Sequence, residues 1–244
     1  MGASGGPSIV HDGLVFGVEA ADKNSYIGSG TTWSDLSPNG NDGTITNAAI
    51  NTESGGCFDF DGTDDYVQIG DSSTMALGTG NVTFMAWVKF NSVSGTQVII
   101  GDEGGSGDTS QNNFHLFMLF DESSVGQIAL RGHTLSPNQY NFILSSTNNV
   151  VSAGNWYHLV AVLDRSSTST SKIYVNGVDK TGSTTNFDSG ANSMDFSYWS
   201  LGRRTNVGDF DLNAKIASVI QYNTVLSHTE VLQNFNAQRS RFGA

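Results

Sequence analysis

The sequence is poor in cysteine, proline and positive charge. Its 244 residues include one cysteine, Cys57, and three prolines. A single cysteine excludes an intrachain disulfide framework, and the segment Cys57–Phe60 predicts that this thiol is a small buried hydrophobe rather than a nucleophile. Lysine and arginine total 11 against 23 aspartates and glutamates, for a net charge of −12. Because phosphate binding needs clustered cations, we expect no nucleic-acid partner.

Long apolar runs are absent as well. None approaches the roughly 20 residues that a membrane-spanning helix needs. The segment Met1–Ser8 lacks the basic and apolar regions of a secretory signal peptide. We therefore expect no membrane partner. If the protein reaches the outside of a cell, we expect it to do so without a secretory signal peptide.

Turn-forming residues are abundant along the whole chain, which contains 29 glycines. A β-sandwich of this length commonly forms one domain. The clearest strand is Val82–Phe90, whose alternate residues form one face beginning with Val82 and another beginning with Thr83. Asn176-Gly177 tolerates positive φ and predicts a hairpin turn after the strand Lys172–Val175.

Short strands separated by polar loops recur along the rest of the sequence. Ser227 and Glu230 match a capping box, which predicts a helix over Ser227–Gln238. Many strands and one short C-terminal helix indicate an all-β, two-sheet antiparallel sandwich over residues 11–244, preceded by a Gly/Ser-rich arm at residues 1–10. The other expected strands are 14–18, 96–100, 114–120, 127–131, 140–144, 156–164, 196–201 and 214–222.

An ordered set of motifs extends over about residues 12–243 and resembles one known family. The set consists of 33–44, with Pro38 where the family usually has glycine, Phe60–Val67, Phe84–Phe90, 155–164 and 172–177, and the closing segments 201–204 and 215–227. In this order they resemble the laminin-G-like jelly-roll domains of the concanavalin-A-like lectin/glucanase superfamily. The resemblance implies that the sandwich is a jelly roll.

A narrower resemblance lies in two segments, Ser25–Ser37 and Gln233–Gly243. Both are similar to laminin-G-like domains in structural proteins of tailed bacteriophages. This implies a virion surface protein, either a capsid decoration or a tail or fibre component, whose partners are other virion proteins or copies of itself and which binds host cell-surface glycans. The alternatives are a secreted, extracellular carbohydrate-binding module or adhesin and, third, a glycan-active enzyme.

The carboxylates do not predict catalysis. Retaining glycosidases hold two carboxyl groups about 5–5.5 Å apart, and one strand can supply them at alternate positions. The five glutamates lack such a pattern, and Asp209 and Asp211, placed on one strand face, have no nearby glutamate to act as the acid. We therefore predict that the protein is not an enzyme. The glutamates are Glu19, Glu53, Glu103, Glu122 and Glu230.

Acidic loops offer candidate ligands for a metal ion. Calcium prefers hard oxygen ligands such as carboxylates, and the family resemblance implies one structural Ca²⁺. The alternative for each aspartate is a solvated or turn-capping side chain. The candidates are Asp61, Asp65, Asp102, Asp108, Asp209 and Asp211.

Aromatic residues in or beside loops are candidates for stacking on a sugar ring, with burial in the core as the alternative. The aromatic candidates are Tyr26, Trp33, Tyr140, Tyr198 and Trp199.

The arm at residues 1–10 has too few apolar groups to offset the free-energy cost of ordering its backbone. We therefore expect the arm to contact another chain through Pro7 and Ile9.

Overall fold

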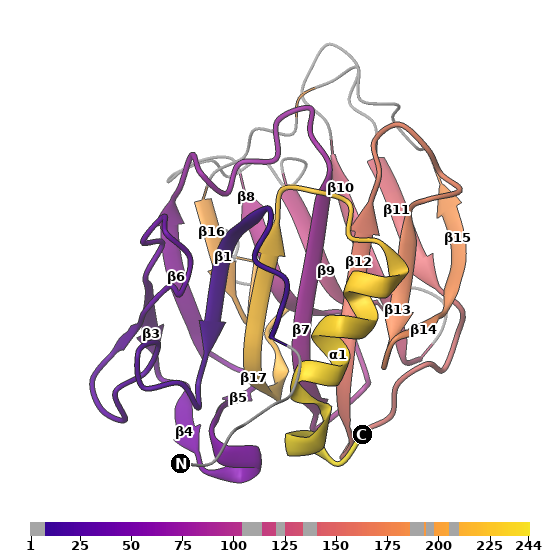
Figure 1. The fold of residues 1–244 in the computed structure, drawn as a ribbon. Helices are drawn as coiled ribbons and strands as arrows, with labels where there is room; N and C mark the ends of the chain where they lie inside the picture. Colours follow the sequence, from indigo (N-terminus) through magenta and orange to yellow (C-terminus); the bar gives the residue numbers. More distant parts are fainter. Residues whose placement is uncertain are drawn as a thin grey trace.

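Two antiparallel sheets pack face to face in the computed structural model, and one helix lies on the outer face of the first sheet (Figure 1). The structure describes residues 8–103, 114–120, 125–133, 141–185, 193, 198–204 and 210–244. The expected all-β, two-sheet antiparallel sandwich with a C-terminal helix is therefore confirmed. No described helix is long and apolar enough to span a membrane.

The first sheet, sheet A, includes the longest strands. Its strands, in spatial order, are β14 (Val178–Asp179), β13 (Lys172–Val175), β12 (Trp156–Leu163), β7 (Val82–Phe90), β17 (Asn213–Tyr222), β5 (Cys57–Asp61) and β4 (Ala49–Asn51), and β1 (Leu14–Glu19) pairs with β17 as well.

The second sheet, sheet B, closes the other side of the sandwich. Its strands are β15 (Thr181–Thr185), β11 (Asn141–Ser146), β10 (Gln127–His133), β9 (Phe114–Phe120), β8 (Gln97–Glu103), β16 (Tyr198–Leu201), β6 (Tyr66–Asp71), β3 (Gly43–Thr46) and β2 (Thr32–Trp33). A short 3-10 helix, η1 (Glu53–Gly55), precedes β5.

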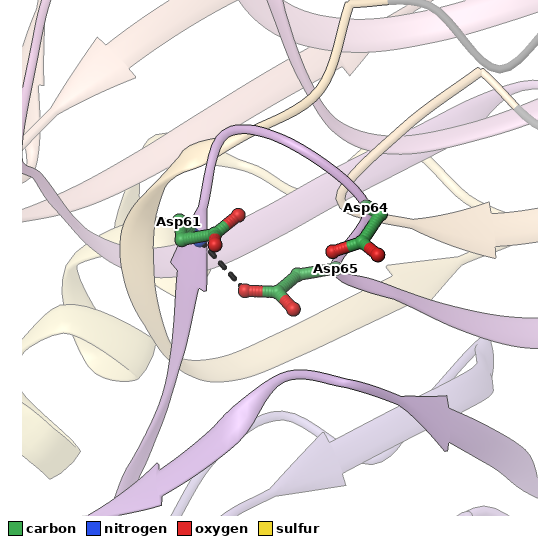
Figure 2. Close-up of side chains that lie close together, drawn as sticks. All are labelled: Asp61, Asp64 and Asp65. Carbon is green, nitrogen blue, oxygen red and sulfur yellow. Dashed lines mark hydrogen bonds between the residues drawn. The ribbon is translucent and has the colours of Figure 1, made fainter.

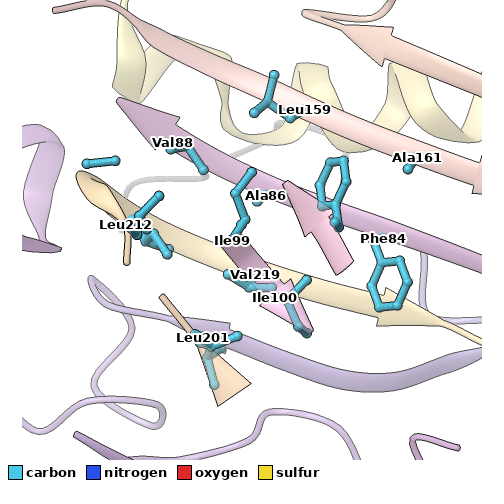
Figure 3. Packing of buried hydrophobic residues seen from close by; sticks show 14 of the residues in the cluster. Phe84, Ala86, Val88, Ile99, Ile100, Leu159, Ala161, Leu201, Leu212 and Val219 are labelled. Atoms are coloured by element: carbon cyan, nitrogen blue, oxygen red, sulfur yellow. The ribbon is translucent and has the colours of Figure 1, made fainter. Parts of the chain in front are cut away.

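Both faces of β7 are buried. Phe84, Ala86 and Val88 point into the core between the sheets, in one cluster with Ile99 of β8 (Figure 3). On the opposite face, Trp87 lies under the helix α1 (His228–Phe242). The predicted alternation of β7 is therefore correct, and each of its two apolar faces has its own cover.

Aromatic rings hold α1 on sheet A. The ring of Trp87 stacks on Phe242 with centroids 4.0 Å apart and on Phe235 at 5.9 Å. The predicted capping box is present, since Ser227 accepts from the Glu230 N–H and the Glu230 side chain accepts from the Ser227 N–H. The helix continues beyond the predicted end at Gln238 because Phe242 is buried against the sheet.

The described end of the arm packs on its own domain. Val10 is buried beside Tyr222, donates its N–H to Asn234 Oδ1 at 2.7 Å and accepts from the Tyr222 hydroxyl at 3.0 Å. Ile9 is half-buried against the same cluster. Ile9 thus packs within its own chain, whereas its expected contact with another chain stays a prediction, and Pro7 lies outside the described residues.

Short polar strands were missed by the sequence pattern. Thr181–Thr185 is not among the strands expected from the sequence, but it pairs with β11 as strand β15. Its sequence, Thr-Gly-Ser-Thr-Thr, contains no hydrophobic residue and most of its residues are exposed, so no alternation of apolar and polar residues identifies it as a strand. Cys57, in contrast, is buried as predicted, and burial raises the pKa of its thiol to about 11.

His158 predicts a pH dependence of stability. The ring is fully buried between Trp87 and Phe235, neither ring nitrogen has a hydrogen-bond partner among the described residues, and burial lowers its pKa to about 3. Because the unfolded chain takes up this proton first, the free energy of unfolding should fall by about 1.4 kcal/mol per pH unit below about pH 6.5.

Urea unfolding of the wild type and of His158→Leu between pH 4 and pH 8 measures this slope. Leucine there breaks no side-chain hydrogen bond with a described residue, so the variant should lack the part of the acid destabilisation that comes from protonation of His158. Equal slopes for the two proteins would contradict the prediction.

Candidate functional site: a polar row on sheet B and an acidic turn

A row of polar side chains crosses four neighbouring strands on the outer face of sheet B. Thr32 of β2 pairs with Thr44 of β3, Thr44 with Gln68 of β6, and Gln68 with Ser200 of β16. The residues next to them in sequence, such as Val67 and Trp199, point into the core. Strand alternation therefore directs the polar row outward.

The hydroxyl and amide side chains of the row become less exposed to solvent from β2 to β16. Thr32 and Thr44 are exposed, Gln68 is half-buried and Ser200 is fully buried. Gln68 Nε2 donates to the Trp199 carbonyl at 2.9 Å, and the Ser200 hydroxyl donates to the Arg203 carbonyl at 2.9 Å. These bonds fix the inner end of the row, whereas the threonine hydroxyls face solvent.

Tyrosines lie beside the row. Tyr66 lies two residues before Gln68 on β6 and pairs with Thr46 of β3. The Arg203 guanidinium lies over the Tyr66 ring, 4.8 Å from its centroid. Tyr198, half-buried, shares the outer face of β16 with Ser200. The sequence pattern identified Tyr198 as a candidate but not the row itself. The row depends on the register between four strands, and the sequence of a single strand does not determine that register.

The acidic turn between β5 and β6 lies at one end of β6. Asp61, Asp64 and Asp65 each offer a carboxylate oxygen, and these oxygens lie within 4.8 Å of one another (Figure 2). The Asp61 N–H donates to Asp65 Oδ2 at 2.7 Å, and the Thr63 N–H donates to Asp61 Oδ1 at 2.8 Å. The turn-capping alternative therefore applies to both predicted residues, while the third carboxylate, Asp64, was not among the predicted ligands.

Electrostatics distinguish Asp65 within this turn. Asp65 is 6% exposed, whereas Asp61 and Asp64 are exposed. Burial raises the pKa of the Asp65 carboxyl, the hydrogen bond from the Asp61 N–H lowers it, and the charges of Asp61 and Asp64 raise it again. Ca²⁺ ligands lie 2.3–2.6 Å from the ion, so two of them can be up to about 5 Å apart. The spacing and chemistry of the three carboxylates fit such an ion.

The remaining predicted metal ligands do not join this turn. Asp211 Oδ1 lies 3.2 Å from Arg203 Nε, so it is an ion-pair partner. Phe210, the residue before Asp211, has φ 57°, which lies outside the strand region, and the expected shared strand face of Asp209 and Asp211 stays untested. Asp108 and Asp209 lie outside the described residues, as does the side chain of Asp102.

Three of the aromatic candidates are core residues. Trp33 and Trp199 are fully buried and Tyr26 is 5% exposed. The rings of Tyr26 and Trp33 pack on Phe58, with centroids 4.9 and 4.6 Å away. Their expected stacking on a sugar is corrected to a packing role, and Tyr140 lies outside the described residues.

Comparisons with known proteins agree with the fold. The family model described as the Concanavalin A-like lectin/glucanases superfamily, Laminin_G_3, matches residues 61–232. A search of curated proteins found no match.

Solved structures share the fold at low sequence identity. A Trypanosoma rangeli sialidase in complex with sialic acid superposes with a TM-score of 0.64 and 17% identity, over 99% of this chain and 37% of that one. The binding domain of botulinum neurotoxin serotype D gives 0.65 and 13%, over 94% and 52%. The serotype G binding domain gives 0.63 and 13%, over 91% and 50%. The chain thus spans only about a third to a half of these proteins.

The sialidases overturn one prediction. The absence of a glutamate pattern led to the prediction of no enzymatic activity, yet structures with the same fold include enzymes at 17% identity. The prediction that the protein is not an enzyme is therefore wrong. The physical reason is that one fold supports both enzymes and binding proteins, so the carboxylate pattern of a single strand does not decide whether the protein has an activity.

Two substitutions at Asp65 separate its hydrogen bond from its charge. Asp65→Ala removes the acceptor of the Asp61 N–H and should lower the free energy of unfolding at pH 7 by about 1–2 kcal/mol. Asp65→Asn retains an acceptor oxygen and removes a buried charge that lies beside two other negative charges. Without added metal, its free energy of unfolding should therefore be at least as large as that of the wild type. Chemical denaturation in EDTA measures both. An Asn variant as unstable as the Ala variant would contradict the assignment.

Proposed function

Because this chain belongs to the concanavalin A-like lectin/glucanase superfamily, we propose that it is a lectin-like binding module whose ligand is a glycan on the outer face of sheet B. The observation that carries the proposal is the outer part of the row, where Thr32, Thr44 and Gln68 reach the surface from three neighbouring strands. Hydroxyl and amide groups both donate and accept hydrogen bonds, as the hydroxyl groups of a sugar require. Tyr198, on the same face, adds a ring for stacking.

We propose further that the module is carried on a phage virion, as a capsid decoration or as a tail or fibre component. Support comes from the resemblance of Ser25–Ser37 and Gln233–Gly243 to phage structural proteins. Docking on other virion proteins or on copies of itself would hold the module there, with the two threonines of the row, Thr32 and Thr44, facing host glycans. Mass spectrometry and cryo-electron microscopy of purified particles test this location.

The alternative is a secreted carbohydrate-binding module or adhesin. The same polar row would bind the same class of ligand, so the two proposals differ only in where the protein is found. Recovery of the protein from culture medium, free of particles, would favour the alternative.

We also propose that Asp61, Asp64 and Asp65 hold a structural Ca²⁺. The spacing of their oxygens and the like-charge repulsion around Asp65 support it. A divalent ion would neutralise that repulsion and fix the turn that leads into β6, the strand of Tyr66 and Gln68.

Glycan binding is predicted to depend on the row. On a glycan array and by titration calorimetry with the best ligand, Thr44→Ala and Gln68→Ala should each weaken binding by about fivefold to tenfold, since each removes one hydrogen-bonding group. The control, Thr229→Ala, makes the same change on an exposed position of α1 and should bind as the wild type does. Equal affinity of all three variants would exclude the row as the site.

Calcium is predicted to stabilise the protein through the acidic turn. In a thermal-unfolding series, added CaCl₂ should raise the Tm of the wild type, because the ion binds only the folded arrangement of carboxylates. Asp64→Asn should reduce this rise, whereas Asp12→Asn, an exposed aspartate outside the turn, should not. A rise that is the same in Asp64→Asn would place the ion elsewhere.

A further inference from the structure

A pocket of about 150 Å³ lies on the outer face of sheet A, on the opposite layer of the sandwich from the polar row. Its floor is formed by two alternate pairs that share one face of β1 and β17, Gly17 with Ile220 and Glu19 with Ser218. A Cβ at Gly17 would lie 3.6 Å from Leu14 Cδ1, an ordinary contact, so a side chain introduced there can occupy the pocket without a clash at its first carbon. The other lining residues are Ile9, Leu14, Val18, Asp22, Leu36 and Gln238.

The pocket has an apolar end and a polar end. Ile9, Leu14, Leu36 and Ile220 supply aliphatic groups, and Leu36 is partly exposed, at 39%. At the polar end, Ser218 is 1% exposed and its hydroxyl has no hydrogen-bond partner among the described residues. A buried hydroxyl without a partner is costly, which indicates that a ligand group completes it.

A second unsatisfied atom lies at the same end. Gln238 Nε2 donates to Glu19 Oε2 at 3.2 Å. Because an ionised carboxylate only accepts, this bond fixes the orientation of the amide. The Gln238 Oε1 atom is buried and lacks a partner among the described residues. The missing group must therefore be a hydrogen-bond donor.

Charge points to the same conclusion. Two carboxylates, Glu19 and Asp22, line the polar end, and Arg241 Nη1 lies 2.9 Å from Glu19 Oε1. Burial raises the pKa of Glu19, Arg241 lowers it, and the charge of Asp22 raises it again. The carboxylates of Glu19 and Asp22 carry two negative charges and the Arg241 guanidinium carries one positive charge. One further positive charge, supplied by a ligand, would neutralise this end of the pocket.

We infer that this pocket binds a primary alkylammonium group, the chemistry of a lysine side chain or of a small alkylamine. An ammonium group carries three donors and no acceptor, which suits Gln238 Oε1, Ser218 Oγ and the carboxylate of Glu19 or Asp22. Its alkyl stem lies along the aliphatic end. A cavity of this size accommodates roughly six non-hydrogen atoms, the size of n-pentylamine. The inference does not rest on the proposed glycan function.

The test uses n-pentylamine at pH 7 as the probe, with backbone amide chemical shifts followed by NMR on the full chain. The amides of Gly17, Glu19 and Ser218 should shift in a saturable way. Binding of n-pentanol and of pentanoate should be weaker by about tenfold or more, because they lack the charge-assisted donors. Methylammonium, which lacks the stem, should be weaker as well.

Three variants define the site. Gly17→Val fills the floor and should abolish binding. Ser218→Ala breaks no existing hydrogen bond, so it should fold as the wild type does while binding n-pentylamine about fivefold more weakly. Asp22→Asn removes one charge and should also weaken binding. The matched control is Ser73→Ala, at an exposed serine outside the pocket, which should bind normally.

The source of the ammonium group is decided by a second probe. Nα-acetyl-lysine N-methylamide presents the same group on a peptide backbone. Binding of this probe together with n-pentylamine would support a lysine of a partner protein as the occupant, and binding of n-pentylamine alone would support a free amine. The inference is overturned if neither probe shifts the pocket amides, or if Ser218→Ala, Gly17→Val and the wild type bind equally.

Discussion

The double-sided burial of β7 constrains the rest of the structure. A strand that is apolar on both faces must be covered twice, and here sheet B covers one face while α1 covers the other. The helix is therefore a third layer of the sandwich, held by the stacking of Phe242 on Trp87 at 4.0 Å. The buried His158, the anchored Val10 and the pocket beside Gln238 all lie under or along this helix.

A single carboxylate connects η1 to the outer face of sheet A. Glu53 accepts from Lys89 at 2.7 Å, Lys215 at 2.8 Å and the Trp156 indole at 3.0 Å, and the bonds from Lys215 and Lys89 lower its pKa to about 2. Arg241, from the end of α1, donates to the carbonyls of Ser54 and Gly56. Helix, 3-10 turn and sheet thus meet at one polar junction beside the aromatic cluster.

The two outer faces offer different chemistry. Sheet B presents neutral hydroxyl and amide groups across four strands, whereas sheet A, where α1 leaves it uncovered, presents an aliphatic pocket with an acidic end. Both faces belong to one β-sandwich, the fold expected of the superfamily. Because sialidases and toxin binding domains have this sandwich too, any activity must be read from the side chains on these faces.

Local signals in the sequence determined the fold class. The period of Val82–Phe90 and the capping box at Ser227 depend on neighbours in the chain, and both predictions agree with the structure. Tertiary structure decided which residues reach solvent. Trp33 and Trp199, expected beside loops, became core, while Thr44 and Gln68 were aligned by pairing between distant strands. Register and burial arise from contacts between segments far apart in sequence, and no single segment encodes them.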